Sequence, residues 1–360
     1  MTAALNIQEN ISLAPLTTLK IGGEARFFAR AEREEYVPEA LEFAYEKGLP
    51  VFILGGGSNV LIADEGFDGL VLQIALKGIS IEGNSVTAAA GEDWDEFVGL
   101  CVKKQLAGVE CLSGIPGFVG ATPIQNVGAY GQDVSETILS VRVLDRETSE
   151  IKTLLHGDCG FLYRSSIFNT TQKGRYVVLA VEFALRQTGQ MGQNGAPEIS
   201  YADLQKYFAG RDDTPSLAEV RAAVIEIRAQ KSMVISAGDP NSKSAGSFFK
   251  NPIVGEEHYR NIQEIAESSG LLESGKTVPS FPAPGSQVKI PAAWLIEKSG
   301  FHKGFVHGNA GISANHTLAI INRGGASAGD VLELKNMIQN GVREKFGIEL
   351  HPEPVFIGFK

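Results

Sequence analysis

The chain has 360 residues, of which 43% are hydrophobic and 21% are charged, and its formal net charge is −10. This balance is typical of globular proteins and excludes a largely disordered chain. The acidic total argues against a general nucleic-acid or membrane-surface binder, which needs a basic face, but it leaves room for a local basic pocket. We expect no signal peptide, no bilayer-spanning segment and a cytoplasmic location.

The first half of the chain predicts short strands mixed with few helices. A helix is expected over 35–47, because Val37, Leu41 and Ala44 share one face and Gly48 follows. The apolar run 51–54 then predicts a buried strand. Further strands are expected at 60–62, 69–74, 79–81, 86–90, 139–144, 151–155 and 177–185, with a helix at 92–104 and a hairpin turn at 145–150. These pieces predict an α+β fold with mixed sheets.

The second half differs in composition. The polar, glycine-rich segment 187–198 is the best candidate for a mobile loop or a domain boundary. After it, helices are expected at 217–231, 256–268, 291–299 and 328–346, and strands at 317–322 and 354–359. The three cysteines (Cys101, Cys111 and Cys159) have no metal-ligand spacing, so we expect reduced core thiols and no metal site.

Two glycine-rich segments are candidate anion sites. In 55–59, glycines would let backbone N–H groups approach a phosphate, although a plain tight turn is the alternative. This segment fails as a dinucleotide fingerprint, because Val60 stands where the third glycine belongs and a strand follows. The 113–131 segment is a long Gly/Pro-rich loop, for which a structural loop is the alternative. An anionic cofactor between the two loops would satisfy the amides of both.

Three shorter motifs carry reactive side chains. Arg164, in the sequence YRSS, could hold a carboxylate in a bidentate fork, although such a tetrapeptide usually lies on the surface. Ser247, between Gly246 and two phenylalanines, could deliver a proton to a carbanion, and a turn serine is the alternative. Glu353 lies between two prolines that stiffen its backbone, and an exposed carboxylate near the chain end is the alternative.

Taken in order, these motifs resemble the UDP-N-acetylenolpyruvoylglucosamine reductase (MurB) family along nearly the whole chain. The resemblance rests on six segments: NISLAPLTTLKIGG (10–23), LGGGSN (54–59), SGIPGFVGATPIQNVGAYG (113–131), YRSSIF (163–168), AGSFFKNP (245–252) and PEPVFIG (352–358). It implies an FAD-binding region of the vanillyl-alcohol-oxidase type in two subdomains, at 1–80 and 81–212, and a substrate-binding domain at 213–349. The strand at 350–360 is expected to return to the first subdomain.

The resemblance also implies the activity. NADPH would reduce non-covalently bound FAD, and the reduced flavin would then reduce an enolpyruvyl UDP-sugar to UDP-N-acetylmuramate, a peptidoglycan precursor. In this family an arginine, a serine and a glutamate act together, and they fall on Arg164, Ser247 and Glu353. Arg164 and Glu353 (protonated, or sharing a proton) would stabilise an enolate-like species that Ser247 protonates.

Ligand contacts follow from the same resemblance. The substrate phosphates would meet Tyr201, Lys231, Asn251 and Lys289, and Tyr201 places the chain in the branch with an extra tyrosine-bearing loop. The FAD contacts would be Gly55, Gly56, Gly57, Ser58, Asn59, Ile115, Pro116, Gly117, Gly120, Ala121, Gly128, Ala129 and Tyr130.

Two other functions remain open at this point: an FAD-dependent oxidase of the same fold, and a non-catalytic sugar-nucleotide sensor. Neither glycine-rich segment contains a histidine or cysteine for covalent flavin attachment, and a sensor would not need the three reactive residues together. We expect a monomer that binds neither nucleic acid nor membrane.

Overall fold

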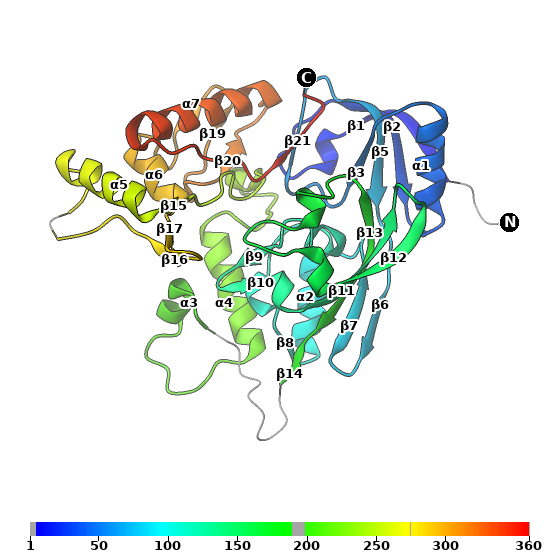
Figure 1. Cartoon of the computed structure of the whole chain (residues 1–360), viewed down its shortest axis with the longest axis horizontal. Coiled ribbons are helices and arrows are strands. Elements are labelled where there is room, and N and C mark those ends of the chain that lie inside the picture. The colour runs from blue at the N-terminus through cyan, green and yellow to red at the C-terminus, as the bar shows by residue number, and fades with distance from the viewer. Residues whose placement is uncertain (1–4, 189–198, 274, 360) are drawn as a thin grey trace. The chain divides into compact units, whose positions relative to one another are not determined.

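A computed structural model of the chain describes residues 5–188, 199–273 and 275–359 (Figure 1). The chain divides into two compact units. Unit 1 contains residues 1–12, 24–57 and 67–234, and unit 2 contains residues 13–23, 58–66 and 235–360. The chain therefore passes repeatedly from one unit to the other within its first 67 residues, and each unit is assembled from separate segments.

The first sheet of unit 1 has the strand order β1-β2-β5-β3. Its strands are β1 (Ile7–Ser12), β2 (Glu24–Ala31), β5 (Phe67–Ile74) and β3 (Val51–Leu54). The strands β2, β5 and β3 are parallel, whereas β1 is antiparallel to β2. Helix α1 (Tyr36–Glu46) connects β2 to β3 and lies beside these strands (Figure 1). Because β3 ends at Leu54, the glycine-rich turn 55–57 begins at the carboxyl edge of a parallel sheet, where ligands commonly bind.

The second sheet of unit 1 is antiparallel, in the order β12-β11-β13-β7-β6. Helix α2 packs on it, with the Phe97 ring 4.9 Å from the Phe183 ring. Asp93 caps α2 by accepting the N–H of Glu96. The elements of this layer are β6 (Ile79–Glu82), β7 (Ser85–Ala89), α2 (Trp94–Lys103), β11 (Ile138–Asp145), β12 (Glu150–Leu155) and β13 (Tyr176–Ala184). Two short strand pairs accompany them: β8 (Leu106–Ala107) with β14 (Arg186–Gln187), and β9 (Gly128–Ala129) with β10 (Gln132–Asp133). Unit 1 also contains helices α3 (Ala202–Tyr207) and α4 (Leu217–Gln230).

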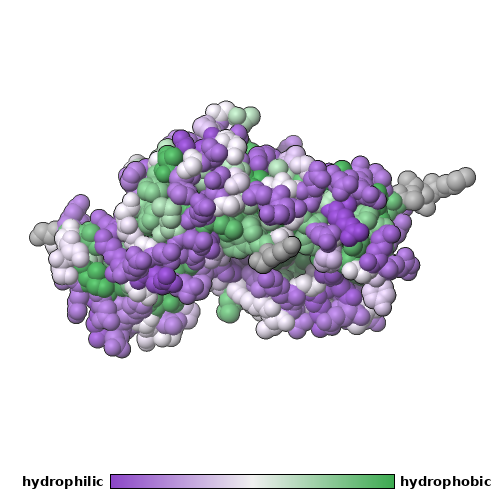
Figure 2. Space-filling model, turned by 90° about the horizontal axis from the view of Figure 1, so that it is seen from above, coloured by the Kyte–Doolittle hydropathy of each residue, from purple (hydrophilic) through white to green (hydrophobic). Residues whose placement is uncertain are grey.

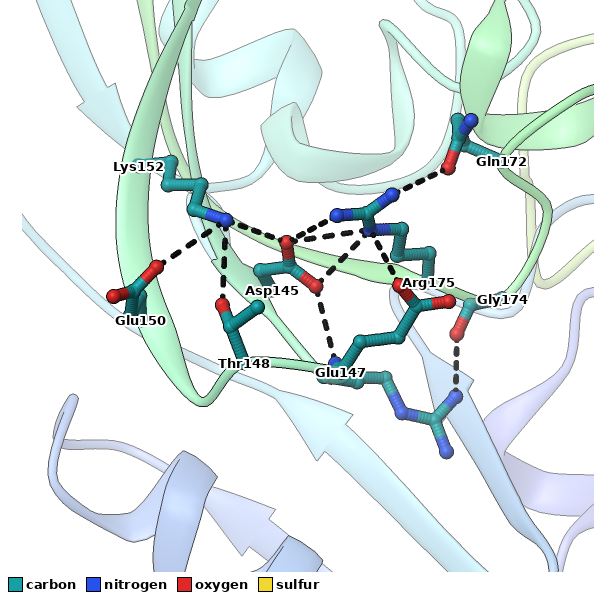
Figure 3. A network of polar contacts seen from close by, with 9 residues as sticks. Asp145, Glu147, Thr148, Glu150, Lys152, Gln172, Gly174 and Arg175 are labelled. Atoms are coloured by element: carbon teal, nitrogen blue, oxygen red, sulfur yellow. Dashed lines mark hydrogen bonds and ion pairs between the residues drawn. The ribbon is translucent and has the colours of Figure 1, made fainter.

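A buried carboxylate holds the β11–β12 hairpin. Figure 3 shows Asp145 between the side chains of Lys152 and Arg175. Lys152 Nζ and Arg175 Nη2 each lie 2.8 Å from Asp145 Oδ2, and the carboxyl is buried. The hydrogen bonds from Arg175 and Lys152 hold the pKa of Asp145 well below its usual range. None of the predicted site residues belongs to this network, which holds the hairpin together.

The described part of unit 2 contains three small sheets and three α-helices. Strand β21 (Val355–Ile357) pairs in parallel with β4 (Val60–Ile62). A strand near residue 356 thus lies beside a strand near residue 61. Helix α7 (Ala328–Phe346) begins with a capping box between Ser327 and Asp330, and Gly347, in the left-handed conformation, follows its last residue. The remaining elements are β15 (Ile253–Gly255), β16 (Phe281–Ala283), β17 (Gln287–Lys289), β18 (Val306–His307), β19 (Ala310–Ile312), β20 (Ile320–Asn322), α5 (Glu256–Ser268), α6 (Ala292–Lys298) and α7 (Ala328–Phe346).

Most of the expected elements are confirmed, and the α+β fold with mixed sheets is among them. The 113–131 segment is not wholly irregular, because it contains a turn of 3-10 helix at Val119–Ala121 and the strand β9. Helix α3 was not expected from the sequence. Of the segment 187–198, the part 189–198 lies outside the described residues.

The expectation of core thiols is confirmed. The thiols of Cys101, Cys111 and Cys159 are free and buried. On the face seen in Figure 2, hydrophilic residues predominate and hydrophobic residues form separate patches between them. No helix in the described part of the chain is both long enough and apolar enough to cross a bilayer.

Candidate active site

The two glycine-rich segments meet in unit 1. A Cβ placed on Gly56 would lie 2.7 Å from the Cα of Gly117, and one on Gly55 would lie 3.6 Å from the Cβ of Ala121. Gly57 and Gly117 both have positive φ, +67° and +130°. A side chain at Gly56 would push the two backbones apart, and the positive φ of Gly57 and Gly117 favours glycine there, whereas the space at Gly55 would accept a methyl group. The two segments are therefore in direct backbone contact at Gly56 and Gly117.

The 113–131 segment is anchored to the start of α2. The N–H of Gly114 donates to Asp95 Oδ1 over 2.6 Å, and Arg221 of α4 grips the same carboxylate through both terminal nitrogens, at 2.6 and 2.8 Å. Burial would raise the pKa of Asp95, but the hydrogen bonds from Arg221 and Gly114 outweigh it and lower that pKa. Farther along, the N–H of Trp94 donates to Gly117 O. These contacts fix the entry of the glycine-rich segment.

A buried cation lies beside the same entry. Arg228 of α4 is 7% exposed, and its Nη2 donates to Met233 O over 2.8 Å. Its Nε has no hydrogen-bond partner among the described residues and would lie 3.4 Å from a Cβ on Gly114. Burial lowers the pKa of Arg228, although an arginine stays charged at neutral pH. A buried guanidinium nitrogen without an acceptor is an incomplete arrangement that an anionic or carbonyl-bearing ligand would complete.

Arg164 is tied to the other end of the 113–131 segment. It has a left-handed backbone, with φ of +51°. Its guanidinium donates to the carbonyl oxygens of Gly128 and Asn126 and lies 3.4 Å from Asp133 Oδ1. A Cβ on Gly128 would lie 2.7 Å from Arg164 Nη1, so the approach of the guanidinium also depends on a glycine. The alternative of an unconstrained surface arginine does not hold.

Two residues beyond Gly128, Tyr130 leads into a second group of predicted residues. The rings of Tyr130 and Tyr201 meet edge to face, with centroids 5.3 Å apart. Lys231 Nζ lies 5.8 Å from the centre of the Tyr130 ring and 2.6 Å from Asp203 Oδ2. We call Tyr130, Tyr201, Asp203 and Lys231 the tyrosine–lysine cluster. It brings the predicted substrate residues Tyr201 and Lys231 together in unit 1.

In unit 2, backbone pairing presents Ser247 and Glu353. The segment around Ser247 is bonded on both sides: Phe248 N–H donates to Leu318 O over 2.7 Å, and Phe248 O accepts the N–H of Glu353 over 2.9 Å. On one side, Ser247 Oγ lies 3.5 Å from His316 Nε2, a long contact. The residue that follows Ser247 is thus hydrogen-bonded to Glu353 itself, so the two predicted reactive residues are close in the fold.

The end of the first glycine turn joins the same group. Asn59 Nδ2 donates to Glu353 O over 3.2 Å, and Asn59 O accepts the N–H of Val355 over 3.0 Å. Thr18 Oγ1 bridges Ser58 O and Ser244 O, at 3.4 and 2.6 Å. Unit 2 therefore holds Ser58 and Asn59 next to Glu353 by contacts of its own.

The last two predicted residues, Asn251 and Lys289, lie at one small sheet of unit 2. Lys289 pairs with Ile253 across β15 and β17, two residues after Asn251. The Lys289 ammonium lies 5.8 Å from the Phe281 ring centre. Asn251 also has a structural use, because its Oδ1 accepts the N–H of Ala292 at the start of α6.

Several residues near these groups were not found from the sequence. Asp203, Arg228 and His316 carry no motif, and each becomes visible only when helices or strands distant in sequence are brought together. Two cavities of about 300 Å³ in unit 1 are lined by none of the predicted site residues; one is lined by Arg142 and its neighbours, the other by Glu136, Arg186 and theirs. Among the described residues, no three His, Cys, Asp or Glu side chains gather closely enough to hold a metal ion.

Comparisons with known proteins converge on one family. The model of the FAD binding domain matches residues 25–154, and that of the UDP-N-acetylenolpyruvoylglucosamine reductase C-terminal domain matches residues 239–357. The UDP-N-acetylenolpyruvoylglucosamine reductase of Thermobifida fusca is 44% identical over 357 residues, covering 97% of each chain. That of Nocardia farcinica is 43% identical and covers 98% of this chain and 90% of its own. The crystal structure of the Thermus caldophilus reductase matches the fold with a TM-score of 0.66 at 24% identity, covering 98% of this chain and all of the other.

Proposed function

The chain belongs to the family of UDP-N-acetylenolpyruvoylglucosamine reductases, and we propose from this premise that it reduces UDP-N-acetylglucosamine enolpyruvate to UDP-N-acetylmuramate with FAD and NADPH. The observation that carries the proposal is the backbone hydrogen bond between Glu353 and Phe248, the residue after Ser247, because this reaction needs both a proton donor and a group that stabilises negative charge.

The residues present fit a non-covalently bound FAD. The contact of Gly56 with Gly117 brings the two glycine-rich segments together, so that backbone N–H groups of both could approach a pyrophosphate beside them. The unpaired Nε of the buried Arg228 offers a donor to an electron-rich part of a ligand. We assign the contacts to Gly55–Asn59, to Ile115–Gly117, Gly120 and Ala121, and to Gly128–Tyr130. When bound, FAD would carry reducing equivalents from NADPH to the enolpyruvyl group.

We assign three roles to the reactive side chains. Arg164 binds the carboxylate of the enolpyruvyl group, because a guanidinium matches a carboxylate in a two-point contact. Glu353 in its protonated form donates to the same carboxylate as negative charge develops on it. Ser247 gives its hydroxyl proton to the carbon next to that carboxylate. The phosphates are assigned to Tyr201, Lys231, Asn251 and Lys289.

Broader features of the family extend the proposal. The FAD-binding subdomains are assigned to 1–80 and 81–212, and the substrate-binding domain to 213–349. We further propose a cytoplasmic monomer whose product enters peptidoglycan, and thus supports cell shape and division. The oxidase and sensor alternatives are not favoured by the family comparisons.

Anaerobic stopped-flow spectroscopy tests the function directly. The FAD-loaded protein is first reduced with NADPH, and the enolpyruvyl UDP-sugar is then mixed with it while flavin absorbance is followed. Rapid reoxidation by the sugar is the expected result. Reoxidation by oxygen alone would instead indicate an oxidase, and a flavin that NADPH does not reduce would favour a sensor.

A further inference from the structure

The ammonium of Lys231 already has an anionic partner in the tyrosine–lysine cluster. Asp203 Oδ2 lies 2.6 Å from Lys231 Nζ, and both side chains are part-exposed, at 42% and 36%. Burial would lower the pKa of Lys231, but the hydrogen bond that its ammonium donates to Asp203, together with the neighbouring Tyr130, outweighs burial and raises that pKa. Lys231 therefore stays protonated at neutral pH, and a ligand that approaches it meets a paired cation.

The position of Asp203 is set by packing as well as by charge. Asp203 lies in the first turn of α3, two residues after Tyr201, which is the residue that precedes the helix. The buried Leu204 anchors α3 in an apolar cluster with Tyr130 and α4 residues, and Phe208 packs against that cluster. Apolar packing therefore holds α3, and with it the backbone of Asp203, in addition to the ion pair with Lys231.

We propose that Asp203 is a positioning residue that competes with the diphosphate of the UDP-sugar for Lys231 and thereby limits how tightly the nucleotide is held. The inference rests on the proposed function, because Lys231 is assigned there to a phosphate. A diphosphate that reaches Lys231 must share its ammonium with a carboxylate 2.6 Å away, and the two anions repel each other. Weaker holding favours release of the product nucleotide.

Substitution of Asp203 separates its charge from its packing. Asp203→Asn replaces the carboxylate with a neutral amide of nearly the same shape. We expect UDP to bind this variant about two- to fivefold more tightly, which corresponds to the energy of a part-exposed ion pair. Asp203→Glu keeps the charge and should bind UDP as the wild type does. Asp213→Asn, which removes a carboxylate paired with Arg211 elsewhere in unit 1, controls for the change in net charge.

Isothermal titration of the FAD-loaded proteins with UDP at two salt concentrations gives the answer. The proposal requires that Asp203→Asn binds UDP more tightly than the wild type and that this difference in affinity becomes smaller at high salt. It also requires that the UDP affinity of Asp213→Asn equals that of the wild type. It is overturned if Asp203→Asn binds UDP equally or less tightly, or if Asp203→Glu behaves like Asp203→Asn. A wild-type protein that binds FAD but not UDP would instead remove the proposed function, so the two failures are distinguishable.

Discussion

The two units hold their predicted site residues by different means. In unit 1, side chains hold backbone: Asp95 fixes Gly114, and Arg164 fixes Gly128 and Asn126. In unit 2, backbone holds side chains: Ser247 and Glu353 are presented by main-chain bonds through Phe248. The site in unit 1 is therefore sensitive to space around glycines and to ion pairs, whereas that in unit 2 should tolerate the loss of a reactive side chain without rearranging.

The largest expected effect is a loss of chemistry in unit 2. Ser247→Ala should leave reduction of the flavin by NADPH intact and slow reoxidation by the enolpyruvyl substrate by about 10²- to 10⁴-fold, the range for a lost proton donor. Single-turnover stopped-flow measures both steps, and Ser269→Ala at an exposed helix end is the control. If both half-reactions of Ser247→Ala run at the wild-type rate, Ser247 has no part in proton transfer.

Next in size is a loss of cofactor binding through unit 1. In Gly56→Ala the new methyl group would lie 2.7 Å from Gly117 Cα, so one backbone must move. We expect FAD affinity to fall at least about tenfold, equivalent to about 1.4 kcal/mol. The flavin retained after gel filtration measures the effect. Gly157→Ala, where a Cβ meets nothing within 4 Å, is the matched control. Unchanged FAD binding in Gly56→Ala would separate this contact from the cofactor.

A smaller effect on stability should follow from releasing the loop anchor. Asp95→Asn weakens the two-point contact with Arg221, whose side chain is 20% exposed, and the bond from Gly114. We expect a loss of about 1–2 kcal/mol in the free energy of unfolding, since both partners retain some access to water. Urea unfolding measures it, and Asp213→Asn should cost less. An equal loss in both variants would argue against a special anchor.

The smallest effect is a pH dependence within unit 1. The backbone and hydroxyl of Ser216, together with Arg211, lower the pKa of Glu219 to about 2. Because the pKa of Glu219 is lower in the folded protein than in the unfolded chain, where it is about 4.3, its ionised form stabilises the fold. This stabilisation is fully present above about pH 4.3 and is lost as the pH falls toward 2. The urea midpoint of the wild type should therefore fall more steeply between pH 4.5 and 2.5 than that of Glu219→Gln. Parallel curves would contradict this role.

The sequence predicts elements well and their partners poorly. Helices such as 256–268 and 328–346 follow from periodicity and caps alone, and their observed bounds agree. The pairing of β21 with β4, by contrast, carries no local signal, because strand partners depend on contacts distant in the sequence. The motif residues Arg164, Ser247 and Glu353 were found by resemblance, but Asp203 was not, because one aspartate in a short helix has no distinctive pattern. The sequence thus indicates which residue types can react or bind, but it does not indicate which residues lie next to one another in the fold.

The alternation of the chain between the two units bears on how the protein is made. Asn59 leaves the ribosome early, yet its partner Glu353 follows it by 294 residues. Unit 2 cannot complete its β4–β21 sheet until residues 355–357 have been synthesised. Its N-terminal segments therefore cannot fold first, as N-terminal domains usually do during synthesis. Such long-range closure slows folding and leaves β4 unpaired during synthesis. Shortened chains that lack the final strand should for this reason be poor folders, whatever the integrity of their flavin loops.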